Sequence, residues 1–211
     1  MADRSEEFDE VCDALDRYER TVDTQLTLIG DIDDKAANVV RYTPLLVGVI
    51  FTALSLASQS PLLSLDTVGL LPRAAFLAAL TGFVVAIFAA TVTYMSSVKD
   101  YGPDAEYGFT VARGSVTSPA YERALLVCFA SAVSNNREVI NVNARRFRWA
   151  LVGLLVGVLY SALAGALVVL DGSKWMRIGV TLVVTFAAGY LAYSISAEAF
   201  LVLERGVSDD E

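Results

Sequence analysis

Four apolar blocks constrain the fold of this chain more than any other feature of its sequence. They cover roughly residues 44–60, 74–96, 149–170 and 176–203, and they contain almost no charged side chains. The hydrocarbon core of a bilayer is about 30 Å thick, and a helix of about 20 apolar residues crosses it. The last three blocks reach this length directly, whereas the first needs flanking polar residues. The sequence therefore predicts four transmembrane helices, with a re-entrant first segment as the alternative.

A heptad pattern leads into the first apolar block without an obvious break. Two positions of the heptad, three residues apart, are almost entirely apolar or aromatic, and the faces between them are rich in acids and arginine. Such a helix exposes an apolar stripe, so it needs a partner helix from this chain or from a second copy. The two positions hold Phe8, Leu15, Val22, Ile29 and Ala36, and Val11, Tyr18, Gln25, Ile32 and Val39.

A second long helix is predicted between the second and third blocks. Glycine and proline make residues 97–117 loop-like, and Ser118-Pro119 is typical of a helix start. Leu126, Val133, Ile140 and Phe147 then recur every seven residues, with Phe129, Asn136 and Asn143 at the companion position. The two asparagines either fix the register of a helix pair from a buried position or face water or a turn of backbone.

Small residues recur every fourth position in the second and third blocks. In a membrane such a stripe lets two helix backbones approach closely, so we predict direct packing between these two helices. The stripes are Ala78, Gly82, Ala86 and Ala90, and Gly153, Gly157, Ser161 and Gly165.

Together these patterns predict an all-α, polytopic (multi-pass) membrane protein. It has four transmembrane helices, and two long cytosolic helices form a coiled-coil-like bundle. The predicted divisions are a cytosolic heptad helix at 1–43, a first transmembrane hairpin at 44–96, a cytosolic loop and helix at 97–148, a second hairpin at 149–203 and an acidic tail at 204–211.

The distribution of basic residues predicts the orientation in the membrane. Most of them lie in 97–148 or near the end of 1–43, whereas the short hairpin loops hold only Arg73, Lys174 and Arg177. Cytoplasmic loops carry the excess of such residues, so both termini and the middle segment are expected in the cytoplasm, with the chain in the cell membrane. Tyr94 and Trp149 at the predicted cytoplasmic ends of the apolar blocks, and Trp175 at an outer end, fit aromatic belts at both interfaces.

Charged residues gather where the two predicted cytosolic helices reach the membrane. If these helices run parallel, the acids of the first lie level with the arginines of the second and form a charged collar that sets their register. Alternatively, the arginines hold lipid phosphates and the acids face water. These candidates for assembly or gating are Asp31, Asp33, Asp34 and Lys35 on the first helix, and Asn136, Asn143, Arg145, Arg146 and Arg148 on the second.

The composition offers little for catalysis. The chain has no histidine, and its two cysteines, Cys12 and Cys128, are expected to be free cytosolic thiols. We find no phosphate-binding glycine loop, nucleophile elbow or zinc-ligand spacing. We therefore predict no enzymatic activity, metal, cofactor or nucleic-acid partner. The net charge of −8, with arginine in excess over lysine, is typical of a halophilic archaeon, or it reflects an acidic helix that stays soluble.

One acidic residue lies inside an apolar block. Glu198 is in the last block, six residues before Glu204, and this spacing favours an interfacial position over a functional one. A transporter or channel for a small solute or ion is the alternative function, and its flux would depend on Glu198.

The junction at Asp33-Asp34-Lys35-Ala36, with Gln25 before it and Asn38 and Arg41 after it, resembles the prokaryotic SLATT and Pycsar-type transmembrane effector families. Asn136-Arg137 before a later apolar block adds to a resemblance that covers about residues 10–150. This chain departs from those families in having four apolar blocks and no recognisable nucleotide-sensor domain. The resemblance implies an antiviral defence effector that oligomerises and breaches the inner membrane, triggered by a nucleotide second messenger or a sensor protein.

The leading functional prediction combines the residue patterns with this resemblance. We expect a non-enzymatic integral membrane protein, in contact with the lipid bilayer, that forms homo-oligomers through its cytosolic helices. A role in membrane disruption is the sharper form of the same prediction.

Overall fold

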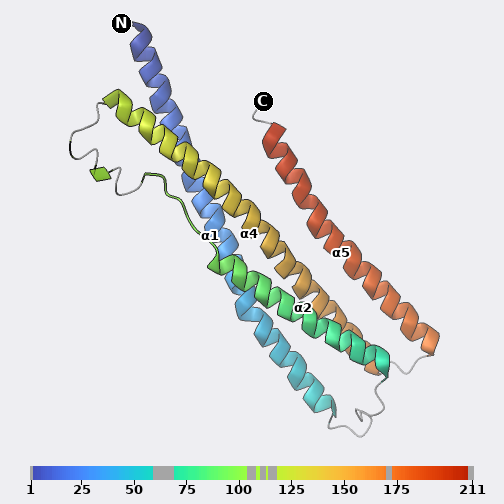
Figure 1. Cartoon of the computed structure of the whole chain (residues 1–211). Coiled ribbons are helices and arrows are strands. Elements are labelled where there is room, and N and C mark those ends of the chain that lie inside the picture. The colour runs from blue at the N-terminus through green and yellow to red at the C-terminus, as the bar shows by residue number, and fades with distance from the viewer. Residues whose placement is uncertain are drawn as a thin grey trace. The chain divides into compact units, whose positions relative to one another are not determined.

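A computed structural model describes residues 2–58, 69–103, 108, 109, 113, 118–169 and 173–208. Within these residues the regular secondary structure is helical and no strand is present, which confirms the all-α prediction (Figure 1). Four helices are long and apolar enough to cross a membrane. They are α1 (Ala2–Ser58), α2 (Leu70–Met95), α4 (Ser118–Val169) and α5 (Lys174–Ser208).

The two longest helices each join a charged part to an apolar part. α1 contains both the acidic heptad region and the first apolar block, with Pro44 inside it. Proline lacks the N–H that would bond to the carbonyl four residues earlier, so the ladder of α1 loses one bond at this point. α4 begins at Ser118, as the Ser-Pro pair predicts, and continues through the third apolar block to Val169.

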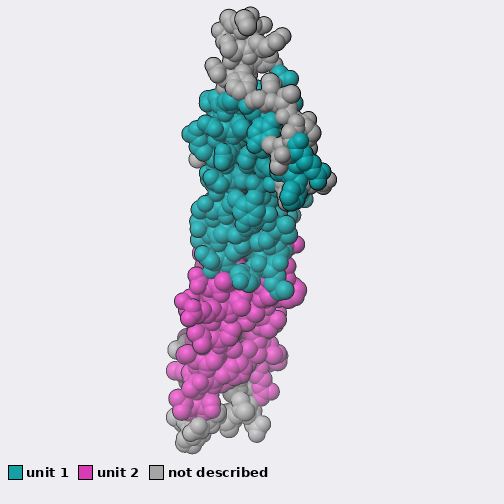
Figure 2. All heavy atoms as spheres, turned by 90° about the vertical axis from the view of Figure 1, so that its left-hand side faces the viewer, with its two compact units in different colours: residues 1–35, 93–145 teal, residues 36–92, 146–211 magenta. Residues whose placement is uncertain are grey.

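The chain divides into two compact units. Unit 1 comprises Met1–Lys35 and Thr93–Arg145, and unit 2 comprises Ala36–Val92 and Arg146–Glu211 (Figure 2). α1 and α4 contribute to both units, so each unit is described by itself. The predicted division at residue 43 falls inside unit 2, because the apolar contacts of α1 with α2 and α4 already begin at Ala36.

Unit 1 is built on the first parts of α1 and α4. Val22 and Ile29, from the first heptad position, are 2% and 1% exposed. The Gln25 side chain donates from Nε2 to the carbonyl of Val133 at 3.2 Å, which joins the two helices at mid-length. On α4 the buried side chains include Ala132, and the heptad residue Val133 is only half-buried.

Unit 2 holds α2 against α4 at a close backbone contact. A Cβ atom on Gly82 would lie 2.7 Å from the backbone nitrogen of Gly157 and 2.8 Å from the carbonyl oxygen of Gly153. This contact confirms the packing that the small-residue stripes predict. The stripe on α4 does not continue to Gly165, because a Cβ there would meet nothing within 4 Å.

Two buried clusters extend the packing of unit 2 on either side of the glycine contact. The first joins α1, α2 and α4, and the second joins α2 to α4 with Val180 and Val184 of α5 packed against it. Tyr160 and Thr185 place their hydroxyl oxygens 2.9 Å apart across α4 and α5. The clusters consist of Ala36, Val39, Ala86, Ala90 and Ala150, and of Ala75, Leu163, Ala164 and Leu167.

Candidate functional site: a polar junction in unit 1

A dense set of polar contacts lies where the chain leaves α2. After Met95 the backbone is no longer helical, and the Ser96 N–H bonds to the Thr93 carbonyl at 3.4 Å. The segment that follows carries hydroxyl, ammonium and carboxylate groups in close succession. Residues from α1, α4 and this segment form a set that we call the polar junction. Its members are Asp33, Ser96, Ser97, Lys99, Asp100, Asn136 and Asn143.

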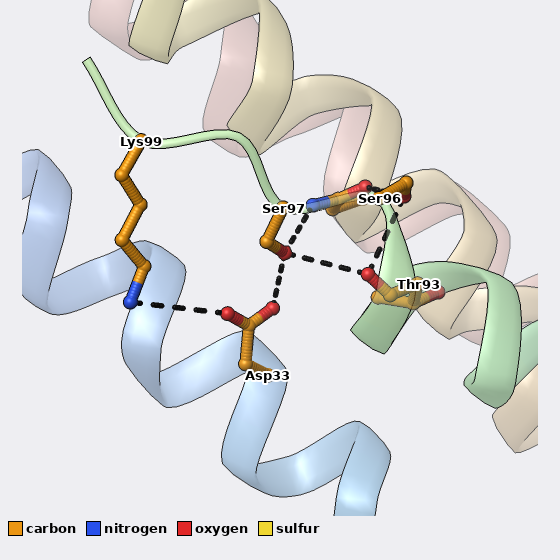
Figure 3. A network of polar contacts seen from close by, with 6 residues as sticks. Asp33, Thr93, Ser96, Ser97 and Lys99 are labelled. Atoms are coloured by element: carbon orange, nitrogen blue, oxygen red, sulfur yellow. Dashed lines mark hydrogen bonds and ion pairs between the residues drawn. The ribbon is translucent and has the colours of Figure 1, made fainter.

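Asp33 is the α1 member of the polar junction. The Ser97 hydroxyl donates to its Oδ1, and the ammonium of Lys99 lies 4.0 Å from its Oδ2 (Figure 3). The side chain of Asp33 is 14% exposed and that of Lys99 is 33% exposed. Both carboxylate oxygens of Asp33 therefore face the segment after α2.

Asn143 joins the same segment to α4. Its Nδ2 donates to the Ser97 hydroxyl oxygen at 2.9 Å, and its Oδ1 accepts from the Ser96 hydroxyl at 3.1 Å. The residue is 2% exposed. Because Ser97 accepts from Asn143 and donates to Asp33, one hydroxyl links α4 to α1.

Asn136, seven residues earlier on α4, binds the backbone of Asp100 with both ends of its amide. Its Oδ1 accepts from the Asp100 N–H at 3.0 Å, and its Nδ2 donates to the Asp100 carbonyl at 2.8 Å. Asn136 is fully buried. An amide side chain offers one acceptor and two donors, so it satisfies both the N–H and the carbonyl of Asp100, which lies outside any helix.

A tight turn fixes the far end of the segment. The Asp100 carboxylate accepts from the Gly102 N–H at 3.0 Å and from Asn135 Nδ2 at 2.9 Å. Gly102 has φ +97°, and a Cβ there would lie 2.9 Å from the ring of Phe129. Both the backbone angle and the close ring favour glycine at this position.

The structure places the predicted assembly or gating residues differently. Asp33, Asn136 and Asn143 meet in the polar junction, whereas Asp31, Asp34, Lys35 and Arg145 are exposed, and Arg146 and Arg148 are half-buried. The two asparagines are buried and face the backbone and hydroxyl groups of a non-helical segment. Ion pairing of the acids with the arginines in a charged collar stays a prediction. Glu198 lies in α5, but its side chain is outside the described residues.

Sequence reasoning did not identify the segment that completes the polar junction. Ser97, Lys99 and Asp100 fall in the predicted loop at 97–117, where Lys99 counts only among the basic residues that indicate orientation, and Ser96 ends the second apolar block. The Asp100-x-Gly102 spacing is the available signal, because an aspartate that accepts from the N–H two residues later is a common turn device. The asparagine partners of the segment have no such local signature.

The polar junction is suited to holding a segment in place. Its contacts are hydrogen bonds between neutral groups, charge-assisted bonds to the carboxylates of Asp33 and Asp100, and one long ion pair. A buried amide that loses its partner costs about 1–3 kcal/mol, so these bonds define one position of the segment. Across the described part of the chain, no group of three or more histidine, cysteine, aspartate or glutamate side chains is arranged to hold a metal ion.

Comparison of the chain with known protein families, curated proteins and solved structures found no match.

Proposed function

We propose that this chain is a non-enzymatic integral membrane protein that assembles with further copies of itself through the helices of unit 1. The observation that supports this proposal is the small apolar core of unit 1. Among the described residues of that unit, the buried apolar side chains are Val22, Ile29 and Ala132. Two long helices and one covering segment expose much of their surface, and helices of this kind are stabilised mainly by packing against neighbours.

Large apolar side chains on unit 1 remain available for such packing. Leu28 on α1 is 46% exposed, and Val127 on α4 is 68% exposed. A second copy that covers them would remove apolar surface from water, at about 25 cal/mol for each Å² buried. The cytosolic location of unit 1 belongs to the same proposal.

The sharper form of the proposal is a membrane-disrupting effector. Its support is the resemblance of the Asp33–Ala36 region to effector families, together with four helices that can cross a membrane. In this form, assembly of unit 1 brings the apolar helices of several copies together and opens the bilayer.

Light scattering of the detergent-solubilised protein, with the detergent mass subtracted, tests the assembly. The intact chain should have the mass of an oligomer, and the L28S/V127S variant should shift towards monomer, because serine removes the apolar contact. The matched L28I/V127I variant keeps the apolar surface and should retain the oligomer. A monomeric intact chain, in detergent and in lipid nanodiscs, would refute the proposal.

Release of a trapped dye from liposomes tests the effector form separately. The intact chain should release dye, and L28S/V127S should release less in proportion to its loss of oligomer. An oligomeric chain that leaves the liposomes intact would contradict membrane disruption while leaving the assembly proposal in place.

A further inference from the structure

Two arginine–aromatic pairs stand at the start of the apolar parts of α1 and α4. Arg41 and Tyr42 are adjacent on α1, and Arg148 and Trp149 are adjacent on α4. The guanidinium carbon of Arg41 lies 5.8 Å from the centre of the Tyr42 ring, within the range of a cation–π contact. We call these four residues the arginine–aromatic band.

Packing within unit 2 brings the two pairs to one level. Val39 of α1 and Ala150 of α4 belong to the same buried cluster, and Val40 and Phe147 pack against it. The arginine–aromatic band lies immediately beside these contacts along each helix. One residue rises about 1.5 Å along a helix axis, so the two pairs are at nearly the same height.

The band stands at a change in surface chemistry. Beyond it, α1 exposes apolar side chains such as Leu45 at 62% and Val49 at 66%, and no charged residue follows on α1 up to Ser58. Tyr42 and Trp149 are themselves 56% and 61% exposed. Exposed aromatic rings at the edge of an apolar surface are characteristic of the membrane–water interface.

The arginines of the band have no carboxylate neighbour on α1, α2 or α4 within unit 2, and Glu198 of α5, whose side chain is outside the described residues, is tested by E198Q below. Within unit 2, the described residues of α1, α2 and α4 include no aspartate or glutamate. In unit 1, Asp33 is engaged by Ser97 and Lys99. An arginine at an interface without a carboxylate partner matches the geometry of a phosphate, which its guanidinium can bind with two parallel hydrogen bonds.

We propose that the arginine–aromatic band binds the phosphate headgroups of anionic phospholipids, with Arg41 and Arg148 as the phosphate ligands. Tyr42 and Trp149 hold the adjacent glycerol and upper acyl region, because their rings combine an apolar body with a polar edge. This inference goes beyond the proposed function: it requires a bilayer around unit 2 but no assembly of unit 1.

Titration of the full chain with lipid tests the proposal. Native mass spectrometry in a zwitterionic detergent measures the affinity for phosphatidylglycerol and for phosphatidylcholine. The intact chain should prefer phosphatidylglycerol, and R41Q/R148Q should weaken that affinity about 25-fold, from about fivefold for each arginine. Affinity for phosphatidylcholine should change much less, and salt should reduce the preference of the intact chain by screening.

Three control variants make the result specific. R20Q/R137Q removes one exposed arginine from α1 and one from α4 within unit 1, and it should leave lipid affinity unchanged. R41K/R148K keeps both charges but loses the two parallel hydrogen bonds of each guanidinium, so its preference should lie between those of the intact chain and R41Q/R148Q. E198Q should not weaken lipid binding. Circular dichroism and gel filtration establish that each variant is folded, and R41K/R148K against the intact chain provides the comparison if the glutamine variant is not.

The following results would contradict phosphate binding by the arginine–aromatic band. Equal affinity of the intact chain for the two lipids would do so, as would an equal loss in R41Q/R148Q and R20Q/R137Q. An equal loss in R41K/R148K and R41Q/R148Q would also contradict it, because charge would then not matter. Inorganic phosphate alone should not raise the melting temperature; an increase equal to that with phosphatidylglycerol would identify a site for free phosphate instead of a lipid site.

Discussion

Asn136 and Asn143 are fully buried polar side chains, and their partners lie on a segment with no regular secondary structure. A buried asparagine is tolerated where its donors and acceptors are satisfied, and each bond then specifies a position. In unit 1 the two residues are seven apart on α4 and bind successive parts of the same segment. Their seven-residue spacing predicts contact with a partner helix, but in unit 1 both side chains bind a non-helical segment.

Replacement of Asn136, which is buried, by alanine should destabilise the protein by about 1–3 kcal/mol, because the N–H and carbonyl of Asp100 would lose their partners in a partly buried setting. Asn135→Ala is the matched control, since Asn135 is exposed and donates one bond to the Asp100 carboxylate. It should lower stability by less than about 1 kcal/mol. Denaturant unfolding in detergent measures both, and equal losses would show that the buried bonds add nothing.

Gly102→Ala should destabilise the segment after α2 by about 1–3 kcal/mol, because alanine disfavours φ +97° and its methyl group would meet the ring of Phe129. Gly108→Ala is the control, since a Cβ there meets nothing within 4 Å. Hydrogen exchange of residues 96–102 should rise in Gly102→Ala alone. Unchanged exchange would mean that the turn does not depend on glycine.

At the scale of the element, the contact between α2 and α4 determines how closely two backbones can pack. Within this contact, the residues of α4 that face α2 follow alternating spacings of three and four, through Ala150, Gly153, Gly157, Tyr160 and Ala164. This alternation is the pattern of helices that cross at a shallow angle, whereas a strict spacing of four drifts around the helix. It explains why Gly165 leaves the contact.

Gly82→Ala should destabilise the protein by about 1–3 kcal/mol, because its Cβ would lie 2.7 Å from the Gly157 nitrogen and the helices would have to separate. Gly165→Ala should be neutral or stabilising by up to about 1 kcal/mol, since the site is open and alanine favours the helix. Thermal unfolding of both variants in the same detergent provides the comparison. An equal effect of the two substitutions would contradict the close contact.

The sequence predicted the elements better than it predicted their polar contacts. Heptad spacing and apolar length predicted α1 as a long helix although it contains Pro44, the absence of breakers before Gly153 predicted a long α4, and Ser118-Pro119 predicted the start of α4. The glycine contact followed from repeated small residues. The Asp33–Ser97–Asn143 chain could not be predicted, because hydroxyl and amide groups at wide separations in the sequence carry no periodic signal. Lys99 could be predicted only as one of the basic residues that indicate orientation, not as a partner of Asp33.

The register between α4 and α5 also indicates the level of Glu198 along the helix axis. Thr185 meets Tyr160 in this antiparallel pair, and residue 198 lies thirteen positions beyond Thr185, while Arg148 lies twelve positions before Tyr160. Helix geometry therefore places the backbone of residue 198 near the level of Arg148. This level favours an interfacial Glu198 over a midplane site for transport.

At the scale of the whole molecule, the four helices that can cross a membrane predict which segments share a side. In a cysteine-free background, A120C and S173C should react from opposite sides of the membrane with an impermeant maleimide. The basic residues predict that position 120 is cytoplasmic and position 173 external. Intact cells should therefore label S173C alone, and opened cells should label both. Labelling of A120C in intact cells would reverse the orientation.

The glycine contact also has a consequence for the history of this protein. Gly82, Gly153 and Gly157 each lack room for a methyl group, whereas Gly165, Gly179 and Gly189 have open space. Substitution of the first three should therefore be opposed by the packing of the fold, whereas the packing places no such constraint on the second three. In homologous proteins, Gly82, Gly153 and Gly157 should remain glycine even where the surrounding apolar residues have been substituted. The pattern of these three glycines could therefore identify distant homologues whose other residues no longer resemble this sequence.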